Sequence, residues 1–304
     1  MMYTHMRTVL RAAVIGVLVI AVSACGTVAN IGAGIGQATG TLDERQAESI
    51  RRTGERAEKS FEDFTPEQEY YVGRSVAATV LENYSEYENE EANEYVASLG
   101  NVLAFFSERP SLYAGYSFQI LDNDELNAFA TPGGHIFVTR GMMRLARNEA
   151  ELAAILAHEI AHVQESHGLQ SIRTSRITAA LTSAAITGAQ LATNEEIGEL
   201  TEVFEDSIDD ITQTLFTAGY SRSSEEDADL VALEILSGAG YDPRALRSFL
   251  EQMQEHWNPD GPGYARTHPS PQDRIDDFDD EISSGSPEVN QRRTERFERF
   301  AGDI

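Results

Sequence analysis

The 304-residue sequence contains a single cysteine and, apart from its N-terminal segment, few long apolar stretches. One cysteine cannot form a disulfide within the chain, so an apolar core must hold the fold together. After residue 25 no run reaches the roughly 18 apolar residues that a membrane-spanning helix needs. These absences predict a folded domain that has neither disulfides nor membrane spans beyond its N-terminal segment.

Basic residues are scarce as well. The chain has 23 Lys and Arg against 50 Asp and Glu, which gives a formal net charge of −27. Phosphate contacts require a basic face, so this balance argues against nucleic acid as a partner. We favour adaptation to a saline environment over a dedicated acidic recognition surface as the explanation, since a high net charge keeps proteins soluble.

The N-terminal segment has the order of a bacterial secretion signal. Arg7 and Arg11 precede an apolar run over residues 12–22, and Val-Ser-Ala then leads into Cys25 as in a lipobox. This pattern predicts a lipoprotein signal peptide, with Cys25 lipidated and forming the mature N-terminus. A plain signal peptide or a single anchoring helix is the alternative. Gly26 follows the cysteine, where lipoproteins that stay at the inner membrane usually have Asp. The resemblance therefore points to the periplasmic face of the outer membrane.

Further along, local patterns predict several elements. Thr65-Pro66-Glu67-Gln68 is a helix start with a capping box, and a second helix is expected over about 90–106. Short apolar, β-prone stretches predict strands at 118–121 and 135–139. Residues 171–193 and 195–216 are also expected to be helical.

Residues 148–168 carry the most informative pattern. Apolar residues recur at helical spacing, which predicts a helix with one buried face. The helix contains His158-Glu159-Ile160-Ala161-His162, in which the two histidines are one turn apart on the same face. Such a pair can bind one Zn²⁺, and Glu159 is then placed to act as general base for an attacking water. A helix with two ordinary histidines remains the alternative.

A second acidic motif supplies the third ligand that a catalytic zinc usually takes. Glu225 and Asp229 are four residues apart, so they share a helix face. Glu225 is the expected ligand, and Asp229 is expected to accept the outer N–H of a ligating histidine. Glu226 is a weaker alternative ligand because Leu230 would stand where its partner is needed. Ser223 with Glu226 is expected to form the capping box of this helix.

Asn127, Ala128 and Phe129 begin a segment that continues through Pro-Gly-Gly into the strand at 135–139. The glycines can be structural only. Alternatively, the segment is an exposed edge beside the metal, where a substrate peptide is held as an added strand. His135 is expected to be a strand residue rather than a ligand.

Four segments resemble the HtpX/BepA-type zinc metalloproteases, the forty-eighth metallopeptidase family, and they follow the family's order. They are NAFATPGGHIFVTRGMM, ELAAILAHEIAHV, YSRSSEEDADLVALEILSGAGYDP and THPSPQDRI. The resemblance covers about 61–275. The chain lacks the multiple spans and the tetratricopeptide array of other members, so it is most similar to the short outer-membrane lipoprotein branch, the LoiP-like members. A disulfide reported for such relatives cannot form here.

The resemblance implies a mainly helical α+β, zincin-like metalloprotease domain with a small β-sheet beside the HExxH helix. In it His158, His162 and Glu225 correspond to the ligands of one zinc ion, Glu159 to the catalytic acid/base and Asp229 to a carboxylate behind a ligand. His268 matches a His-Pro loop whose histidine can cap the open zinc position and keep the enzyme latent. The implied division is a signal peptide at 1–24, a flexible tether at 25–60, the protease domain at 61–282 and a polar tail or peripheral helix at 283–304.

The expected function is zinc-dependent cleavage of misfolded or misassembled periplasmic or outer-membrane proteins. Tyr220, Arg222 and His268 are candidate donors to the oxyanion of the tetrahedral intermediate, and the sequence does not choose between them. The alternative function is a largely latent, zinc-containing chaperone or assembly factor for outer-membrane proteins. Expected partners are protein or peptide substrates, the membrane through the N-terminal lipid, and the outer-membrane protein assembly machinery. A degenerate scaffold without metal is the weakest option.

Overall fold

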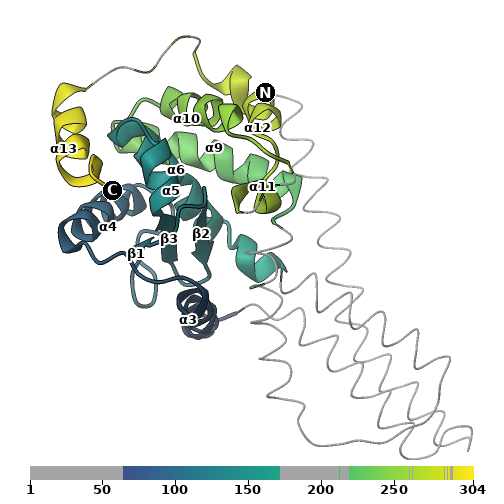
Figure 1. The fold of residues 1–304 in the computed structure, drawn as a ribbon. Helices are drawn as coiled ribbons and strands as arrows, with labels where there is room; N and C mark the ends of the chain where they lie inside the picture. The colour runs from purple at the N-terminus through teal and green to yellow at the C-terminus, as the bar shows by residue number, and fades with distance from the viewer. Residues whose placement is uncertain are drawn as a thin grey trace, which may run out of the picture. The chain divides into compact units, whose positions relative to one another are not determined.

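The structure is a computed structural model that describes residues 64–171, 212, 219–259, 261, 263–283, 285, 287 and 290–304. The predicted signal peptide, the tether and the expected helices over 171–193 and 195–216 lie outside these residues, except for Ser171 and Thr212. Among the described residues no helix is both long enough and apolar enough to cross a bilayer. The described part is mainly helical with one small sheet, which confirms the predicted α+β class (Figure 1).

The sheet contains three strands in the order β1-β3-β2. Strand β3 (His135–Thr139) lies in the middle, parallel to β1 (Ser117–Leu121) and antiparallel to β2 (Ala128–Thr131). The turn from β2 to β3 passes through Gly133 and Gly134, both at positive φ, a conformation that glycine adopts without steric cost. Strand β2 is therefore an edge of the sheet as described.

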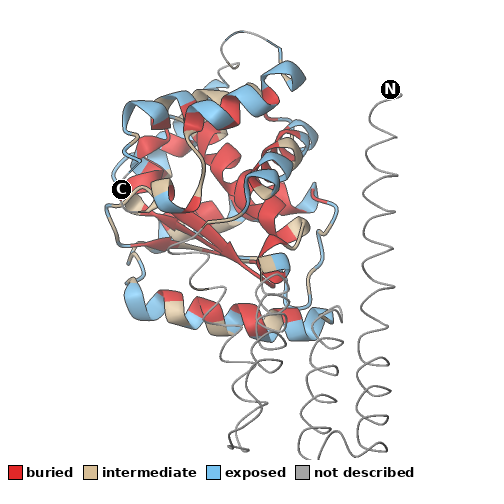
Figure 2. Cartoon of the chain, turned by 90° about the vertical axis from the view of Figure 1, so that its right-hand side faces the viewer, coloured by how far each residue is buried: buried red, intermediate tan, exposed pale blue. Residues whose placement is uncertain are grey.

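Helix α3 (Pro66–Asn83) covers one face of the sheet (Figures 1 and 2). Its N-terminus has the predicted capping box between Thr65 and Gln68. Gly73 allows the helix to approach the β2–β3 turn, because a Cβ at this position would lie 1.5 Å from the carbonyl oxygen of Pro132. The backbones of helix and turn are thus in direct contact.

The opposite face of the sheet is covered by helices of the main core (Figure 1). Helix α4 (Glu90–Phe105) packs on β1, and the short α5 (Arg140–Leu145) follows β3 directly. Helix α6 (Glu149–Gln164), the predicted HExxH helix, packs against α4 and β2.

Helix α6 is buried on all sides rather than along the single apolar face expected from the sequence. The alanines at 153, 154, 157 and 161 occupy the positions between its larger apolar residues, and all four are inaccessible to solvent. Small side chains let neighbouring elements approach the helix from every direction, so no face remains for solvent. A helix buried all round is typical of the centre of a fold.

Helix α9 (Arg222–Gly238) packs along α6. It begins two residues before the position that the expected capping box requires, because Ser221 is the N-cap and accepts a hydrogen bond from the backbone N–H of Ser224. The prediction of a Ser223–Glu226 box was therefore wrong, although Glu225 and Asp229 still share a face. The remaining elements are α10 (Arg244–Glu255), α11 (Tyr264–Thr267), α12 (Pro271–Phe278), the 3₁₀ turn η2 (Asp279–Glu281) and α13 (Gln291–Ala301).

The C-terminal helix α13 packs on the core through Phe297 and Ala301. Its Arg296 makes two hydrogen bonds to Glu149, the first residue of α6. The hydroxyl groups of Tyr95 and Tyr241 donate to the same carboxylate, over 3.1 Å and 2.7 Å. Both oxygens of this fully buried carboxylate are thus satisfied by donors from three other parts of the chain.

Candidate metal centre

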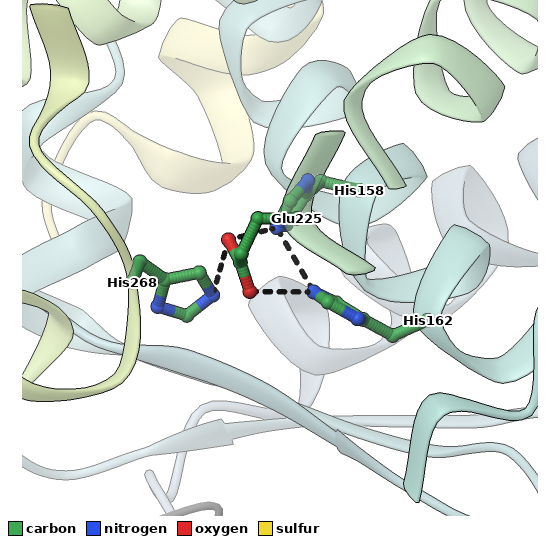
Figure 3. Close-up of side chains that lie close together, drawn as sticks. All are labelled: His158, His162, Glu225 and His268. Carbon is green, nitrogen blue, oxygen red and sulfur yellow. Dashed lines mark hydrogen bonds and ion pairs between the residues drawn. The ribbon is translucent and has the colours of Figure 1, made fainter. Parts of the chain in front are cut away.

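Two helices and one loop bring four potential ligands together. His158 and His162 come from α6, Glu225 from the first turn of α9, and His268 from the residue after α11 (Figure 3). One ligand atom from each lies within 4.8 Å of the others. All four side chains are at most 5% exposed.

The distances between these atoms suit a single small cation. The Nε2 atoms of His158 and His162 are 3.1 Å apart, and they lie 3.6 Å and 3.4 Å from the two oxygens of Glu225. Ligands held tetrahedrally at about 2.0–2.1 Å from zinc are about 3.3–3.4 Å from one another. His268 Nε2 is 3.9 Å from Glu225, slightly outside this range.

The carboxylate of Glu225 shows that the cluster is incomplete without a cation. Neither of its oxygens has a hydrogen-bond partner among the described residues, although both are buried. Burial therefore raises the pKa of Glu225 above its ordinary value. Burial also lowers the pKa of His162 and of His268 to about 3, so both imidazoles are neutral and have a lone pair available. Neutral imidazoles with one carboxylate are a donor set that fits zinc.

Behind His158 lies a buried ion pair. His158 Nδ1 is 3.0 Å from Asp229 Oδ1, and Arg274 holds both oxygens of Asp229 at 2.5 Å and 2.9 Å. If His158 Nδ1 carries a proton and donates it to Asp229, Nε2 presents a lone pair to the cluster. Asp229 thus lies where it fixes both the tautomer and the orientation of this ring.

Arg274 had no assigned role in the sequence analysis. It is among the largest fully buried side chains. One sequence signal would have found it: Pro271, Arg274, Ile275 and Phe278 follow i, i+3, i+4, i+7 spacing, and all four are the buried face of α12. An arginine in such a stripe requires a buried acidic partner.

His162 has a different environment from His158. The ring of Tyr220 stacks on it with centroids 4.4 Å apart, and its Nδ1 lies 2.8 Å from His167 Nδ1. No role for His167 is predicted from the sequence. Tyr220 also lines a small hollow beside His162, together with Pro132, Leu169 and others.

Glu159 lies beside the cluster and is 1% exposed. Burial, followed by the charge of Glu225, raises its pKa to about 8, while Arg274 and a backbone hydrogen bond from Ala130 oppose the rise. Its Oε1 has no hydrogen-bond partner within the described residues. A divalent cation nearby would lower this pKa, since it adds positive charge at short range.

The three candidate oxyanion donors are not equally placed. Arg222 does not face the cluster: its side chain is 63% exposed and pairs with Asp277 at 3.2 Å. This arrangement contradicts its expected role, because the guanidinium is already neutralised at the surface. Tyr220 and His268 do lie at the centre.

The expectation of an exposed edge at Asn127, Ala128 and Phe129 was also wrong, since all three are buried. Phe129 packs on Tyr84 and on Phe137, while Ala128 belongs to the main core. Helices α3 and α6 pack on β2, and β3 is its strand neighbour in the described sheet. His135 begins β3 and is not part of the cluster.

Comparison with known proteins matches residues 90–282 to Peptidase family M48. A beta-barrel assembly-enhancing protease of Yersinia pestis is 29% identical over 186 residues, which are 60% of this chain and 37% of that protein. The protein of the same name from Escherichia coli K12 is 28% identical over 200 residues, 65% of this chain and 40% of that protein. The mitochondrial metalloendopeptidase OMA1 of Schizosaccharomyces pombe is 29% identical over 162 residues, 53% of this chain and 44% of that protein. The chain thus spans less than half the length of these relatives.

Proposed function

The chain belongs to Peptidase family M48. From this premise we propose that it is a zinc metalloendopeptidase that cleaves misfolded or misassembled periplasmic or outer-membrane proteins of a bacterial envelope. The observation that carries the proposal is the cluster of four ligand atoms within 4.8 Å, with a buried carboxylate that lacks any hydrogen-bond partner. A structural ion pair would leave no such carboxylate.

His158, His162 and Glu225 are the proposed zinc ligands. Their mutual distances of 3.1–3.6 Å support this assignment. Zinc bound by three protein ligands lowers the pKa of a coordinated water towards about 7 and polarises a carbonyl group. The protein contributes the buried setting, the fixed tautomer of His158 through Asp229, and a carboxylate for proton transfer.

Glu159 is the proposed general base and then general acid. It takes a proton from the attacking water and passes it to the nitrogen of the leaving amine. The backbone hydrogen bond from Ala130 ties Glu159 to β2.

His268 is the proposed cap of the open ligand position. Its ring stacks on Tyr264 with centroids 3.8 Å apart and an interplanar angle of 6°, and its Nδ1 is 2.9 Å from Thr267 Oγ1. These contacts leave Nε2 facing Glu225. For substrate to bind, this loop must move, after which Tyr220 is the proposed donor to the oxyanion.

Two further parts of the proposal concern the location of the protein. Cys25 is the proposed lipidation site, which would anchor the chain on the periplasmic face of the outer membrane. Several relatives carry a name that refers to β-barrel assembly. This name supports the outer-membrane protein assembly machinery as a partner.

The test is Glu159→Gln, measured for zinc content and for cleavage of an unfolded envelope protein. We expect about one zinc per chain and no proteolysis, because the amide keeps the shape but cannot accept the proton. Glu165→Gln, at the half-buried C-cap residue of the same helix, is the matched control and should cleave as the wild type does. Undiminished cleavage by Glu159→Gln would refute the assigned role.

The position of His268 favours one second candidate, a largely latent assembly factor with zinc. His268→Ala separates the two. If His268 caps the site, the variant should cleave faster than the wild type. If cleavage stays at background in both while the protein still assists assembly of β-barrel proteins, the assembly function is favoured.

A further inference from the structure

The two histidines of α6 differ in what supports them from behind. His158 Nδ1 faces the carboxylate of Asp229, at 3.0 Å. His162 Nδ1 faces another imidazole, since His167 Nδ1 lies 2.8 Å away. His167 is 3% exposed, and its ring meets that of His162 edge to face at 5.0 Å. A buried contact of this length between two ring nitrogens requires that one of them donates and the other accepts.

His167 reaches this position through an unusual turn after α6. Residues five apart do not meet on a regular helix. Ser166 lies between them and has φ of 56°, a left-handed conformation that is uncommon for a residue other than glycine. This turn returns the chain beneath the helix end and brings the His167 ring to His162.

The turn is held by a partly buried ion pair. Arg109 donates to Ser166 Oγ at 3.0 Å and to the carbonyl oxygen of Val163 at 2.9 Å. The same guanidinium pairs with Glu69 of α3 at 2.7 Å. Local strain persists where the surroundings determine it, and here three separate segments of the chain do so. The contact between the two histidines is therefore built in by the fold.

Proton positions follow from the proposed ligand role of His162, on which this inference rests. If His162 Nε2 binds the metal, the ring proton must be on Nδ1, and His167 Nδ1 must accept it. We propose that His167 is a positioning residue, a neutral hydrogen-bond acceptor that fixes the tautomer and orientation of the ligand His162. Its own proton then lies on Nε2.

The charge of the centre gives a reason for an imidazole at this position. Glu159, Glu225 and Asp229 are buried carboxylates, and Arg274 is the buried cation beside them. With a divalent ion these charges balance. A fourth carboxylate behind His162 would leave one uncompensated negative charge in a buried site, which is costly. A neutral acceptor orients His162 without that cost.

The test compares two substitutions that differ in one property. His167→Phe keeps a ring of similar size but removes the acceptor, whereas His167→Asn places an amide oxygen close to the position of Nδ1. Zinc affinity is measured by competition with a chromophoric chelator, and the Co²⁺-substituted proteins are compared by their visible absorption. His256→Phe, at an exposed histidine, is the control.

We expect His167→Phe to weaken zinc binding by about 10- to 100-fold, the usual effect of removing a partner behind a metal ligand. His167→Asn should remain within about threefold of the wild type and keep its Co²⁺ spectrum. Wild-type affinity in His167→Phe overturns the inference. Equal losses in both variants also overturn it, because they would indicate a packing role.

A measurement on the wild type covers the case in which His167→Phe does not fold. Long-range ¹H–¹⁵N spectra of the zinc-loaded protein report the tautomer of each imidazole. We expect the proton of His167 on Nε2, and a proton on Nδ1 would overturn the inference. A wild-type chain that binds no zinc would overturn the proposed function itself, whereas these outcomes for His167 leave that function intact.

Discussion

Two buried carboxylates, one on helix α6 and one packed against it, have opposite surroundings. Glu149, at the start of the helix, receives hydrogen bonds from Tyr95, Tyr241 and Arg296. Glu225, which faces the third and fourth turns, has two buried oxygens without a hydrogen bond among the described residues. The exposed fractions are 0% and 1%, so burial alone does not separate them.

The difference shows how a structural carboxylate is told from a functional one. Hydrogen-bond donors satisfy both oxygens of Glu149, so this residue links α6 to the C-terminal helix α13. Lack of donors makes Glu225 unfavourable until a cation arrives, since a buried charge without a partner is costly. Functional sites commonly give up stability in this way.

The largest expected effect is at Glu225. Glu225→Gln should reduce peptidase activity by at least about 10³-fold, since the loss of this proposed zinc ligand would remove several kcal/mol of transition-state stabilisation. Without metal, the same variant should melt about 2–4 °C higher than the wild type, because a neutral amide replaces an unpaired carboxylate. A peptidase assay measures the first effect. Calorimetry in the presence and absence of a chelator measures the change in melting temperature. A lower melting temperature of the metal-free variant would contradict the comparison.

Glu149 should behave in the opposite way. Glu149→Ala is expected to lower the free energy of unfolding by about 3 kcal/mol, the lower end for breaking a buried charge pair because Arg296 is half-exposed. Zinc affinity per folded chain should stay within about twofold of the wild type. Urea unfolding and zinc titration test this, with the exposed Glu298→Ala on α13 as control.

Asp229 is the intermediate case. Arg274 pairs with both of its oxygens, and it also contacts the proposed metal ligand His158. Asp229→Asn should weaken zinc binding by about 10- to 100-fold. It should also destabilise the fold, because Arg274 loses its buried anion. Competition titration measures the loss of zinc affinity and urea unfolding measures the loss of stability. Asp227→Asn, at a neighbouring exposed residue, is the control for both. Unchanged zinc affinity would mean that Asp229 serves Arg274 alone.

The smallest expected effect is at His135, whose Nε2 also lacks a partner among the described residues. Burial, followed by the charge of Arg74, lowers its pKa below 6.5. The unfolded chain therefore binds a proton more readily, so stability falls as the pH drops below about 6.5. His135→Gln should lose less stability than the wild type between pH 7 and pH 5, by less than about 1 kcal/mol. His256→Gln, at an exposed histidine, is the control.

The sequence predicted those parts of the fold that depend on neighbours in the chain. The capping box at Thr65 and the i, i+4 pair of histidines follow from helix geometry alone. The spacing of Glu225 and Asp229 likewise predicts a shared face, whichever serine caps the helix. Together with the resemblance to the family, these patterns were enough for the fold class and the enzyme class.

Other features depend on contacts between distant segments. His167 is five residues after His162, and only the left-handed Ser166, held by Arg109, brings it back to the helix. Arg222 was one of three candidate oxyanion donors between which the sequence does not choose, and its ion pair with Asp277 lies at the surface. Helix α6 was expected to have one buried face, because the periodicity of its large residues does not report what packs against its alanines.

The contact between Gly73 and Pro132 has a mechanical consequence. Helix α3 presses its backbone on the turn that joins β2 to β3, with no side chain between them to yield. A pull on the chain just ahead of Thr65 would therefore displace this turn and, through β2, the backbone of Ala130 that holds Glu159. Tension at the start of the described domain would in this way reach Glu159, the proposed general base.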